Sequence, residues 1–584
     1  MMKMQKSEYR PVTDEERRRL EQNRCSASDW HSLFVKDSTD LSLIRDVDFE
    51  GRVCIGALSL EASHPNGISR ARIADSTLGD YVLIRNIGRE IRGAEIRDDV
   101  QIENVAAIIF EPEAPCGVGV MASVLDETGS RPVRFYPDLS SQTASLMALK
   151  PRWAEDSLFP QLDDLAEQSP ASHSIGIGSI IRDSGLIKNV HIDAGVRIEG
   201  ASRLSNGSII NNADSSRPLS YIGAGVDAEN FMIVDGVADS GAILRNTFVG
   251  QGAILEKGFT AHDSVFFANS SMENGEACAL FAGPYSVSMH KSTLLIGCML
   301  SFMNAGSGTN QSNHMYKLGP VHWGILERGV KTSSFSYIML GAKVGPFSLV
   351  MGSHKNHPDS SEFPFSYLFG DDKGATTVVP AMMLRSCGLL RDEKKWPTRD
   401  RRLKRKLRML DRVHFAVLNP MTVARILDAI DLMRELQIKP ADDDGFIRYK
   451  GMKLRRAHLQ RAEIIYGEAI CKYLYERIGE NDLPEATSDT PDEWVDLGGQ
   501  LITRSTLRSV LEADTLSEAD AILDKAYETF EADELRWIAD RLPDEWRRRK
   551  ADWSLGAENF DRHIEEDRTM YRDGLSAEHS MLAL

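Results

Sequence analysis

Large aliphatic residues recur at every sixth position in the middle of this 584-residue chain. Two shorter pairs, Leu78 with Ile84 and Ile96 with Ile102, keep the same spacing. The two long series are Ile180, Leu186, Ile192, Ile198, Leu204 and Ile210, and then Val237, Ile243, Val249 and Leu255, continued by Ala261 and Phe267. If aliphatics occupy roughly a quarter of positions, the five matches that follow Ile180 arise by chance about once in a thousand trials.

A period of six fits neither an α-helix nor a strand that alternates at every second residue. It is typical of a chain that forms a short strand, turns and repeats, with one large side chain per strand directed inwards. Between the aliphatics lie segments such as "DAGVRI" and "SNGSII", whose Gly, Asn and Asp suit left-handed corners. These segments resemble the hexapeptide repeat of left-handed parallel β-helix proteins. The resemblance implies a solenoid in which three six-residue repeats, or hexads, make one triangular coil.

The same pattern divides the chain into five parts. We expect an N-terminal helix and lead-in (1–45), in which Thr13 and Glu16 form a capping box. A first part of the β-helix (46–110), an insertion with helical character (111–170) and the main β-helix (171–385) follow. The remainder (386–584) is expected to be an α-helical domain. Its predicted helical faces are Leu403, Leu407 and Leu410; Val423, Ile426, Leu427 and Ile430; and Tyr466, Ile470, Leu474 and Ile478. The predicted fold is therefore mainly a β solenoid with an inserted segment and a helical C-terminal domain.

Composition narrows the classes of function. The net charge of −17 argues against general binding to nucleic acid, because such a protein repels phosphate. No run of 18 apolar residues predicts a membrane span, and the first residues carry no apolar stretch of a secretory signal. The seven cysteines form no Cys-x-x-Cys pair, which is typical of reduced thiols. We therefore expect a cytoplasmic protein.

Three further segments carry a second resemblance. They are "YRPVTDEE" with "CSASDWHSLFV" near the N-terminus, "SNHMYKLGPVHWG" in the centre and "GLLRDEKKWPTRDRR" after the repeats. Together they are similar to an uncharacterised bacterial family of hexapeptide-repeat proteins with helical C-terminal domains. That family implies no activity.

The central segment holds the candidate chemistry. Asn313, His314, Tyr316, Lys317 and His322 gather where the six-residue spacing dissolves. Many proteins that resemble this fold transfer an acyl group from acyl-coenzyme A to a sugar or nucleotide sugar. A histidine base near neutral pKa and amide donors for the oxyanion would suit that reaction. We predict His314, then His322, as the general base. Alternatively, each of these histidines is a surface residue or a structural residue that only forms hydrogen bonds.

Two alternatives remain open. His314, His354 and His357 could bind a divalent metal through three neutral imidazoles. The chain could instead be a non-catalytic scaffold or binding protein, since a solenoid offers a regular surface. The basic run from Arg399 to Arg412 could hold a coenzyme phosphate or form a solvated helix face. No glycine-rich Walker loop is present. The fold resemblance implies a homo-oligomer, with a trimer favoured.

Overall fold

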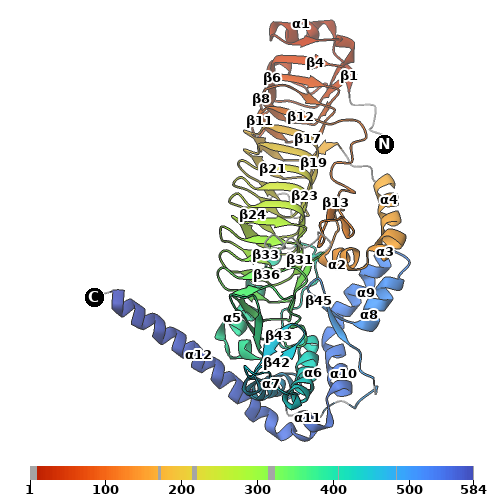
Figure 1. Ribbon diagram of the computed structural model, residues 1–584. Coiled ribbons are helices and arrows are strands. Elements are labelled where there is room, and N and C mark those ends of the chain that lie inside the picture. The colour runs from red at the N-terminus through yellow and green to blue at the C-terminus, as the bar shows by residue number, and fades with distance from the viewer. Residues whose placement is uncertain are drawn as a thin grey trace.

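The computed structural model describes residues 9–168, 173–212, 220–312, 322–405, 407–479, 481, 483, 485–488 and 490–582. Figure 1 shows an elongated column of stacked strands, with an inserted segment along one side and a helical region at the lower end. The column belongs to a 41-stranded sheet in which most strand pairs are parallel. A large, mostly parallel sheet and a helical C-terminal region are thus confirmed.

The upper end of the column carries helix α1 (Asp14–Gln22), as Figure 1 shows. The Thr13 hydroxyl accepts a hydrogen bond from the Glu16 amide, and the Glu16 carboxylate accepts one from the Thr13 amide. The predicted capping box is therefore confirmed. Leu20 is the buried residue of this short helix.

Strands of the column pair in parallel with strands further along the chain. We call the stretch of chain from one strand to its paired strand a tier. In the early tiers Leu78 pairs with Ile96, an offset of three full hexads. Later, Ile181 on β16 (Ile180–Arg182) pairs with Ile198 on β18 (Arg197–Glu199), so the tier there is one residue shorter than three hexads. The longer strands of the column are β4 (Ile44–Glu50), β6 (Gly67–Ala74), β8 (Leu83–Ile87), β11 (Gln101–Val105), β17 (Leu186–Ile192), β19 (Arg203–Ile210), β21 (Asp227–Val234), β23 (Ile243–Val249) and β25 (Thr260–Phe266).

The shortened tier corrects the predicted six-residue register. In the early tiers of three full hexads, Leu78, Ile84, Ile96 and Ile102 all lie in the interior, as predicted. Later, the interior residues follow spacings of six, six and five, so a strict six-residue series slips by one position per tier. The interior residues there are Ile175, Ile181, Ile187, Ile192, Ile198, Leu204 and Ile209, then Ala238, Leu244, Val249, Leu255, Ala261 and Phe266.

The slip moves several predicted interior residues to the outer surface. Ile180 and Leu186 are half-buried, and Ile243 is 40% exposed. Ile210 and Phe267 are buried, but within a second hydrophobic cluster outside the column. The central members Ile192, Ile198 and Leu204 are interior residues as predicted. An adjacent apolar residue takes the inward position in each of these cases, such as Ile181 beside Ile180 and Phe266 beside Phe267.

Asparagines form one corner of the column. Asn189, Asn206, Asn230 and Asn246 each have a positive φ between 48° and 55°, the left-handed region that Asn tolerates. The side-chain amide of each donates to the next, at 3.3, 3.4 and 3.1 Å, and Asn246 donates to Asp263 at 3.1 Å. This ladder satisfies polar groups where the strand bends, as the Asn and Asp at the predicted corners led us to expect.

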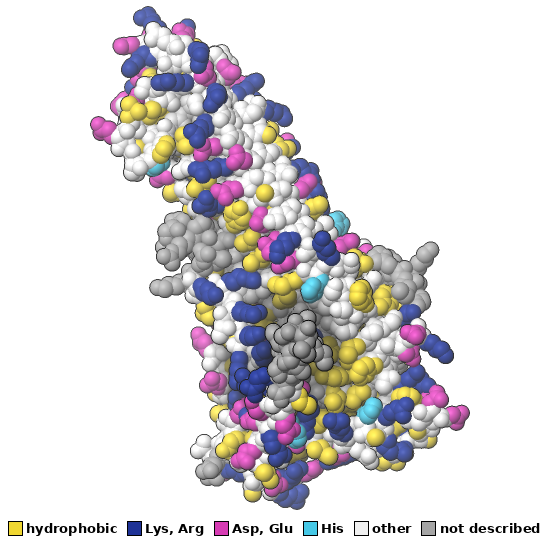
Figure 2. Space-filling view, turned by 90° about the vertical axis from the view of Figure 1, so that its left-hand side faces the viewer, with side chains coloured by type: hydrophobic (Ala, Val, Ile, Leu, Met, Phe, Trp, Pro, Cys, Tyr) yellow, Lys and Arg dark blue, Asp and Glu magenta, His cyan; other side chains and the backbone are white. Residues whose placement is uncertain are grey.

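Ion pairs link neighbouring tiers on the exposed faces. Arg203 contacts Asp227 at 3.1 Å, and Arg245 contacts the same carboxylate at 3.0 Å. Figure 2 shows Lys and Arg side chains intermixed with Asp and Glu over the column. The visible face therefore carries both signs of charge rather than one.

The insertion leaves the column after β12 (Ala107–Ile109), and the chain rejoins it at β15 (Ser174–Ile175). Ala107 on β12 still pairs with Leu186 on β17, so the tiers on either side of the insertion stack directly. The insertion contains β13 (Met121–Ser123), β14 (Pro132–Arg134), α2 (Ser141–Leu149), α3 (Pro151–Trp153) and α4 (Phe159–Gln168). Its predicted helical character is confirmed.

The column ends in the hairpin β40 (Tyr367–Gly370) and β41 (Thr376–Val379), which pairs with β43 (Met452–Leu454) of the hairpin that begins with β42 (Ile447–Tyr449). The helical region consists of α5 (Cys387–Thr398), α6 (Pro420–Ile438), α7 (Arg456–Arg477), α8 (Arg504–Glu512), α9 (Leu516–Glu528), α10 (Phe530–Arg541), α11 (Asp544–Arg548) and α12 (Trp553–Leu582). The predicted faces of α6 and α7 are buried, as expected. No described helix is both long enough and apolar enough to cross a bilayer.

One predicted helix is wrong. Residues 399–405 and 407–415, which we call the strap, form a short 3-10 helix at Leu403–Arg405 and otherwise run irregularly along the column. Leu407 and Leu410 are buried, but Leu403 is 56% exposed. Distant side chains bind the strap's peptide groups, so the strap does not need helical hydrogen bonds to satisfy them. Gln251 of the column accepts from the Leu410 amide at 2.8 Å and donates to the Arg408 carbonyl at 2.9 Å.

Candidate functional site

One outer face of the column carries an apolar stripe. Because successive tiers pair in parallel, side chains at equivalent positions lie next to one another. The stripe begins one tier after Ser208 and consists of Met232, Phe248, Val265, Phe281, Met299 and Ile325. Lys343 follows Ile325 in the next tier and ends the stripe. An outward apolar stripe of this length requires a cover.

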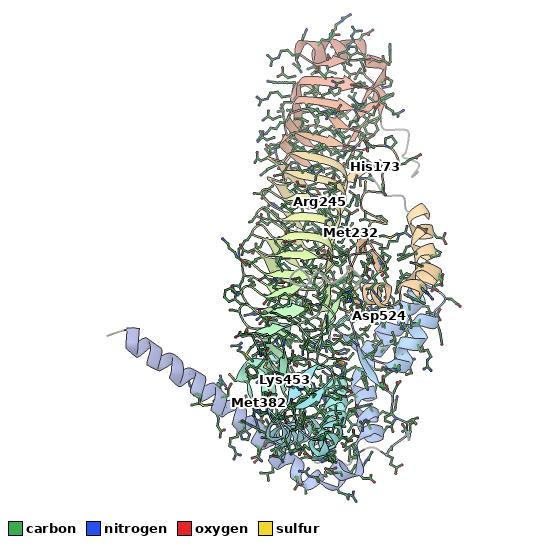
Figure 3. All side chains as sticks on the ribbon, viewed as in Figure 1. His173, Met232, Arg245, Met382, Lys453 and Asp524 are labelled. Carbon is green, nitrogen blue, oxygen red and sulfur yellow. The ribbon has the colours of Figure 1, made fainter. Side chains whose placement is uncertain are left out.

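The insertion covers the upper part of the stripe. Met232, Phe248 and Val265 are completely buried, in a cluster with insertion residues such as Phe135. The Phe135 and Phe248 ring centroids are 5.7 Å apart. In Figure 3, Met232 lies on the side of the column that faces the insertion. The cover continues down to Leu149, where α2 ends.

A cavity of about 220 Å³, which we call the junction cavity, lies where the insertion stops covering the stripe. The column contributes Phe281, Met299 and Ile325, the last three members of the stripe. The other walls come from Leu149, from Met421 and Arg425 of α6, and from Val495, Asp496 and Gly498 of the hairpin β44 (Trp494–Leu497) and β45 (Gln500–Thr503). All three parts of the protein therefore meet at this cavity.

Two ion pairs form the polar part of the wall. Glu327 pairs with Arg425, whose Nη1 also donates to the Ser361 carbonyl at 3.2 Å. Arg328 pairs with Asp496, with 3.1 Å between Nε and Oδ2. Both acidic partners are partly shielded from solvent, so these pairs are screened less than surface pairs. The four formal charges balance.

Arg328 has donor capacity that the protein does not use. The residue is 2% exposed, and its Nη2 donates to the carbonyls of His414 (2.9 Å) and Gly499 (2.7 Å). Its guanidinium lies 4.6 Å from the centroid of the Phe302 ring, which fixes its plane. Within the described part of the chain, the buried Nη1 has no hydrogen-bond partner, and Nε has none beyond its ion pair with Asp496. A buried donor left unpaired costs about 1–3 kcal/mol.

Burial shifts the ionisation of this wall. It raises the pKa of Glu327, and the Arg425 guanidinium opposes that shift. It lowers the pKa of Arg328, and Asp496 opposes that shift. The described lining residues include neither His nor Cys. An apolar wall with a few fixed polar groups is the usual form of a ligand-binding pocket.

A second groove of about 610 Å³ adjoins the cavity, because Ile325, Glu327 and Arg425 line both. Its remaining lining is mainly acidic: Glu362, Asp428, Asp431 and Glu435, with Lys343, Ser361 and Leu432. The stripe thus passes from an apolar covered section, through the junction cavity, to a negatively charged groove.

The predicted catalytic cluster lies mostly outside the described residues, which include neither Asn313 and His314 nor Tyr316 and Lys317. His322 is described and exposed, directly before Trp323, whose ring lies 4.9 Å from the Arg131 guanidinium of the insertion. Strand β34 (Gly324–Leu326) begins two residues after His322 and brings Ile325 to the junction cavity. The predicted base His322 and the cavity therefore belong to one short segment.

Of the three predicted metal-binding histidines, His314 lies outside the described residues, and His354 and His357 make other contacts. His354 is completely buried; its Nε2 donates to the Met351 carbonyl at 3.1 Å and its Nδ1 lies 2.8 Å from the Thr376 hydroxyl. Burial lowers the pKa of His354 to about 4. His357 is exposed, with Nδ1 2.7 Å from the Leu340 carbonyl. Neither ring nitrogen of His354 is left for a metal, and no group of three or more metal-binding side chains occurs among the residues described.

The basic run lies in the strap, where it binds the protein itself. Arg402 is 1% exposed and pairs with Asp400 at 2.8 Å. Arg412 pairs with Asp524 at 2.7 Å, and Arg401 donates to Ser271 Oγ at 2.8 Å. These contacts join the column to the helical region, whereas the sequence pattern suggested a solvated helix face or a phosphate site.

The sequence analysis did not identify Arg328. One local signal is that Glu327 and Arg328 stand between Leu326 and Val330, two interior residues of the same tier. Charged residues so close to interior positions are rarely buried unless they are paired. Their partners Arg425 and Asp496 lie about 100 and 170 residues further along the chain, beyond the reach of a local pattern.

Comparison with known proteins assigns the chain to a family. Residues 9–437 match the family described as "Domain of unknown function (DUF4954)", so the chain belongs to this family. An uncharacterized protein of Treponema pallidum (strain Nichols) is 25% identical over 461 residues. The match covers 73% of this chain and 61% of the Treponema protein. The matched family range includes the column, the insertion, the strap and most of α6.

Proposed function

We propose that this member of the DUF4954 family is a binding protein whose small-molecule ligand occupies the junction cavity. The observation that carries the proposal is the uncovered end of the apolar stripe. The upper stripe is buried by the insertion, whereas Phe281, Met299 and Ile325 line a cavity. Apolar pockets with a few fixed polar groups are the usual form of a ligand site. This function is close to the scaffold or binding protein that we considered from the sequence.

The test is to fill the cavity. Purified protein would be screened against a fragment library by thermal shift, and hits would be checked by ligand-observed NMR. We expect hits that bind the wild type and are lost in Met299→Trp, because the indole would occupy the cavity. Met289→Trp is the matched control, since Met289 is 44% exposed and lies outside the cavity lining. Hits that survive Met299→Trp, or a complete lack of hits, would contradict the proposal.

Acyl transfer is the second candidate function. In this proposal the column is a left-handed parallel β-helix of hexapeptide repeats, assembled as a trimer, and acyl-coenzyme A donates to a sugar or nucleotide sugar. Two observations favour it: parallel tiers that span three hexads or one residue less, and the exposure of His322 on the segment that leads to the junction cavity. An apolar cavity lined by a strand that begins two residues after an exposed histidine suits an acyl group whose general base comes from the same segment.

Its test is turnover with acetyl-coenzyme A and a panel of UDP-sugars. We expect activity in the wild type that is lost in His314→Ala and in His322→Ala and kept in His357→Ala, whose ring bonds to a carbonyl. Elemental analysis of the same preparation would test the proposed divalent metal. Absence of turnover, with fragment binding retained, would leave the binding function alone.

A further inference from the structure

The junction cavity also indicates the chemical class of its ligand. We infer that it binds an uncharged apolar molecule of about eight or nine carbon atoms, held between the lower end of the stripe and α6. This inference rests on the proposed binding function and adds the ligand class. Three features of the cavity support it: its apolar lining, its size, and a wall whose charges already neutralise one another.

Apolar side chains line the cavity from all three parts of the protein. Phe281, Met299 and Ile325 come from successive tiers, so they form a floor roughly 10 Å long, at about 4.8 Å from strand to strand. The remaining apolar side chains are Leu149 of α2, Met421 of α6 and Val495 of β44. Ligand carbon that enters the cavity exchanges water for contact with carbon, which is the favourable direction of the hydrophobic effect.

The volume sets the size of the ligand. In protein interiors, an apolar cavity of about 150 Å³ stays dry and binds benzene. The junction cavity, at about 220 Å³, offers roughly half as much space again. In proportion, it holds about eight or nine carbon atoms, the size of a benzene ring with a short alkyl chain. A longer molecule would reach the adjoining groove, where apolar atoms meet charged side chains.

The charged groups of the wall favour an uncharged ligand. Glu327 and Arg425 form one ion pair. Arg328 and Asp496 form the other. All four residues line the cavity, so the formal charges cancel within its own wall. An ion that enters an apolar cavity loses its hydration, and it recovers that loss only if a free opposite charge waits there. An uncharged apolar molecule has no such loss.

The adjoining groove does not change this preference. Its lining carries more acidic than basic side chains, which disfavours a carboxylate at the mouth of the cavity. Several of its carboxylates already have cationic partners, so an ammonium group there would compete with charges in place. These pairs are Asp428 with Arg541, Asp431 with Arg434, and Glu362 with Lys450.

The first test compares propylbenzene with two charged analogues of similar size, 3-phenylpropanoate and 3-phenylpropylammonium. Affinities would be measured by isothermal titration calorimetry on the full chain. We expect propylbenzene to bind about tenfold more tightly than either ion, or more, because only the ions give up hydration without gaining a partner. Tighter binding of the anion would overturn the inference. Tighter binding of the cation would also overturn it, and would assign the ligand to amines held by the groove.

A series of alkylbenzenes tests the size. From benzene to propylbenzene, the affinity should rise about fourfold with each added CH₂ group. It should stop rising at pentylbenzene, which exceeds the space. In Met421→Ala, which shortens a lining side chain, pentylbenzene should bind several-fold more tightly than in the wild type. Met299→Ala serves the same purpose if that variant fails to fold.

Met289→Ala is the matched control for these two variants, because Met289 is 44% exposed and lies outside the lining. It should leave every affinity of the series unchanged. A rise that continues undiminished to pentylbenzene in the wild type, or an equal gain in the control, would contradict an apolar cavity of this size.

The outcomes separate the two proposals. If propylbenzene fails to bind, or binds Met299→Trp as it binds the wild type, the ligand class is wrong. The same holds if one of the ions binds most tightly. The binding function then stands only if other probes or fragments are lost in Met299→Trp. If nothing that binds the wild type is lost in that variant, the ligand class and the binding function are both wrong.

Discussion

Asp411 joins three parts of the protein, and its replacement should separate them. The side chain is 3% exposed. Oδ1 accepts from the Ser141 amide at the start of α2, and Oδ2 accepts from the Ala268 amide of the column, each at 2.7 Å. In Asp411→Asn one carboxylate oxygen becomes an NH₂ group that faces an N–H donor. One of the two backbone amides therefore loses its acceptor.

The expected cost follows from these two contacts. A hydrogen bond to a charged group contributes about 1.5–3 kcal/mol, and a buried donor left unpaired costs about 1–3 kcal/mol more. The sum is roughly 2.5–6 kcal/mol, which corresponds to an opening equilibrium raised by about two to four orders of magnitude. The effect should be local, because the interior of the column does not involve the strap.

Native-state hydrogen exchange measures this opening. We expect protection of the α2 amides to fall by that factor in Asp411→Asn, while amides of the early tiers around Ile84 keep theirs. Arg408→Ala is the matched control, because Arg408 also links the strap to the insertion. Its pair with Asp138, at 3.4 Å, is 73% and 56% exposed, so its loss should cost less than about 1 kcal/mol. Unchanged α2 protection in Asp411→Asn, or an equal loss in Arg408→Ala, would refute the reasoning.

Three further predictions concern stability. His354 has a folded pKa of about 4, below its unfolded value of about 6.5. Its contribution to the free energy of unfolding, about 3 kcal/mol, is therefore complete above pH 6.5 and lost as the pH falls towards 4. His354→Gln should flatten the pH dependence of urea unfolding in that range; an unchanged slope would contradict the shift. Phe248→Ala should cost about 3–5 kcal/mol and Ile243→Ala less than about 1, since Phe248 is buried and Ile243 is 40% exposed. Equal midpoints for these two variants would show that the outer face is not covered. Gly329→Ala should cost about 2–4 kcal/mol, because φ is 76° and the new Cβ would lie 2.1 Å from Phe347 Cδ1; a melting temperature equal to wild type would argue against that geometry.

The repeat could be predicted from the sequence because its signal is local. Ile192 and Ile198 lie in the interior where the six-residue spacing places them. Ile180 does not, because a tier one residue short of three hexads moves the inward position to Ile181, and both residues are equally apolar. Only the pairing between tiers, Ile181 with Ile198, distinguishes the two. Spacing alone therefore predicts the type of structure better than its exact register.

The strap and the cavity depend on contacts that local patterns do not contain. Leu407 and Leu410 have a helical spacing, but Gln251 binds the backbone there from a distant part of the chain. Arg328 is placed by Asp496 and by the carbonyls of His414 and Gly499. In the candidate cluster around His322, the sequence showed residue types that suit catalysis but not their positions in space. The structure relates His322 to the cavity only along the chain, through strand β34.

The position of the insertion has a consequence for biosynthesis. Its residues leave the ribosome before the surface on which they pack, since that surface extends to Phe281. At about 5–20 residues per second, roughly 6 to 23 seconds separate the end of α4 from residue 281. During this interval the surface that covers Phe135 and its apolar neighbours is incomplete, and Asp411, which accepts a hydrogen bond from the Ser141 amide of the insertion, emerges later still. A nascent chain stalled before Phe281 should therefore be the form most prone to aggregate and most dependent on chaperones.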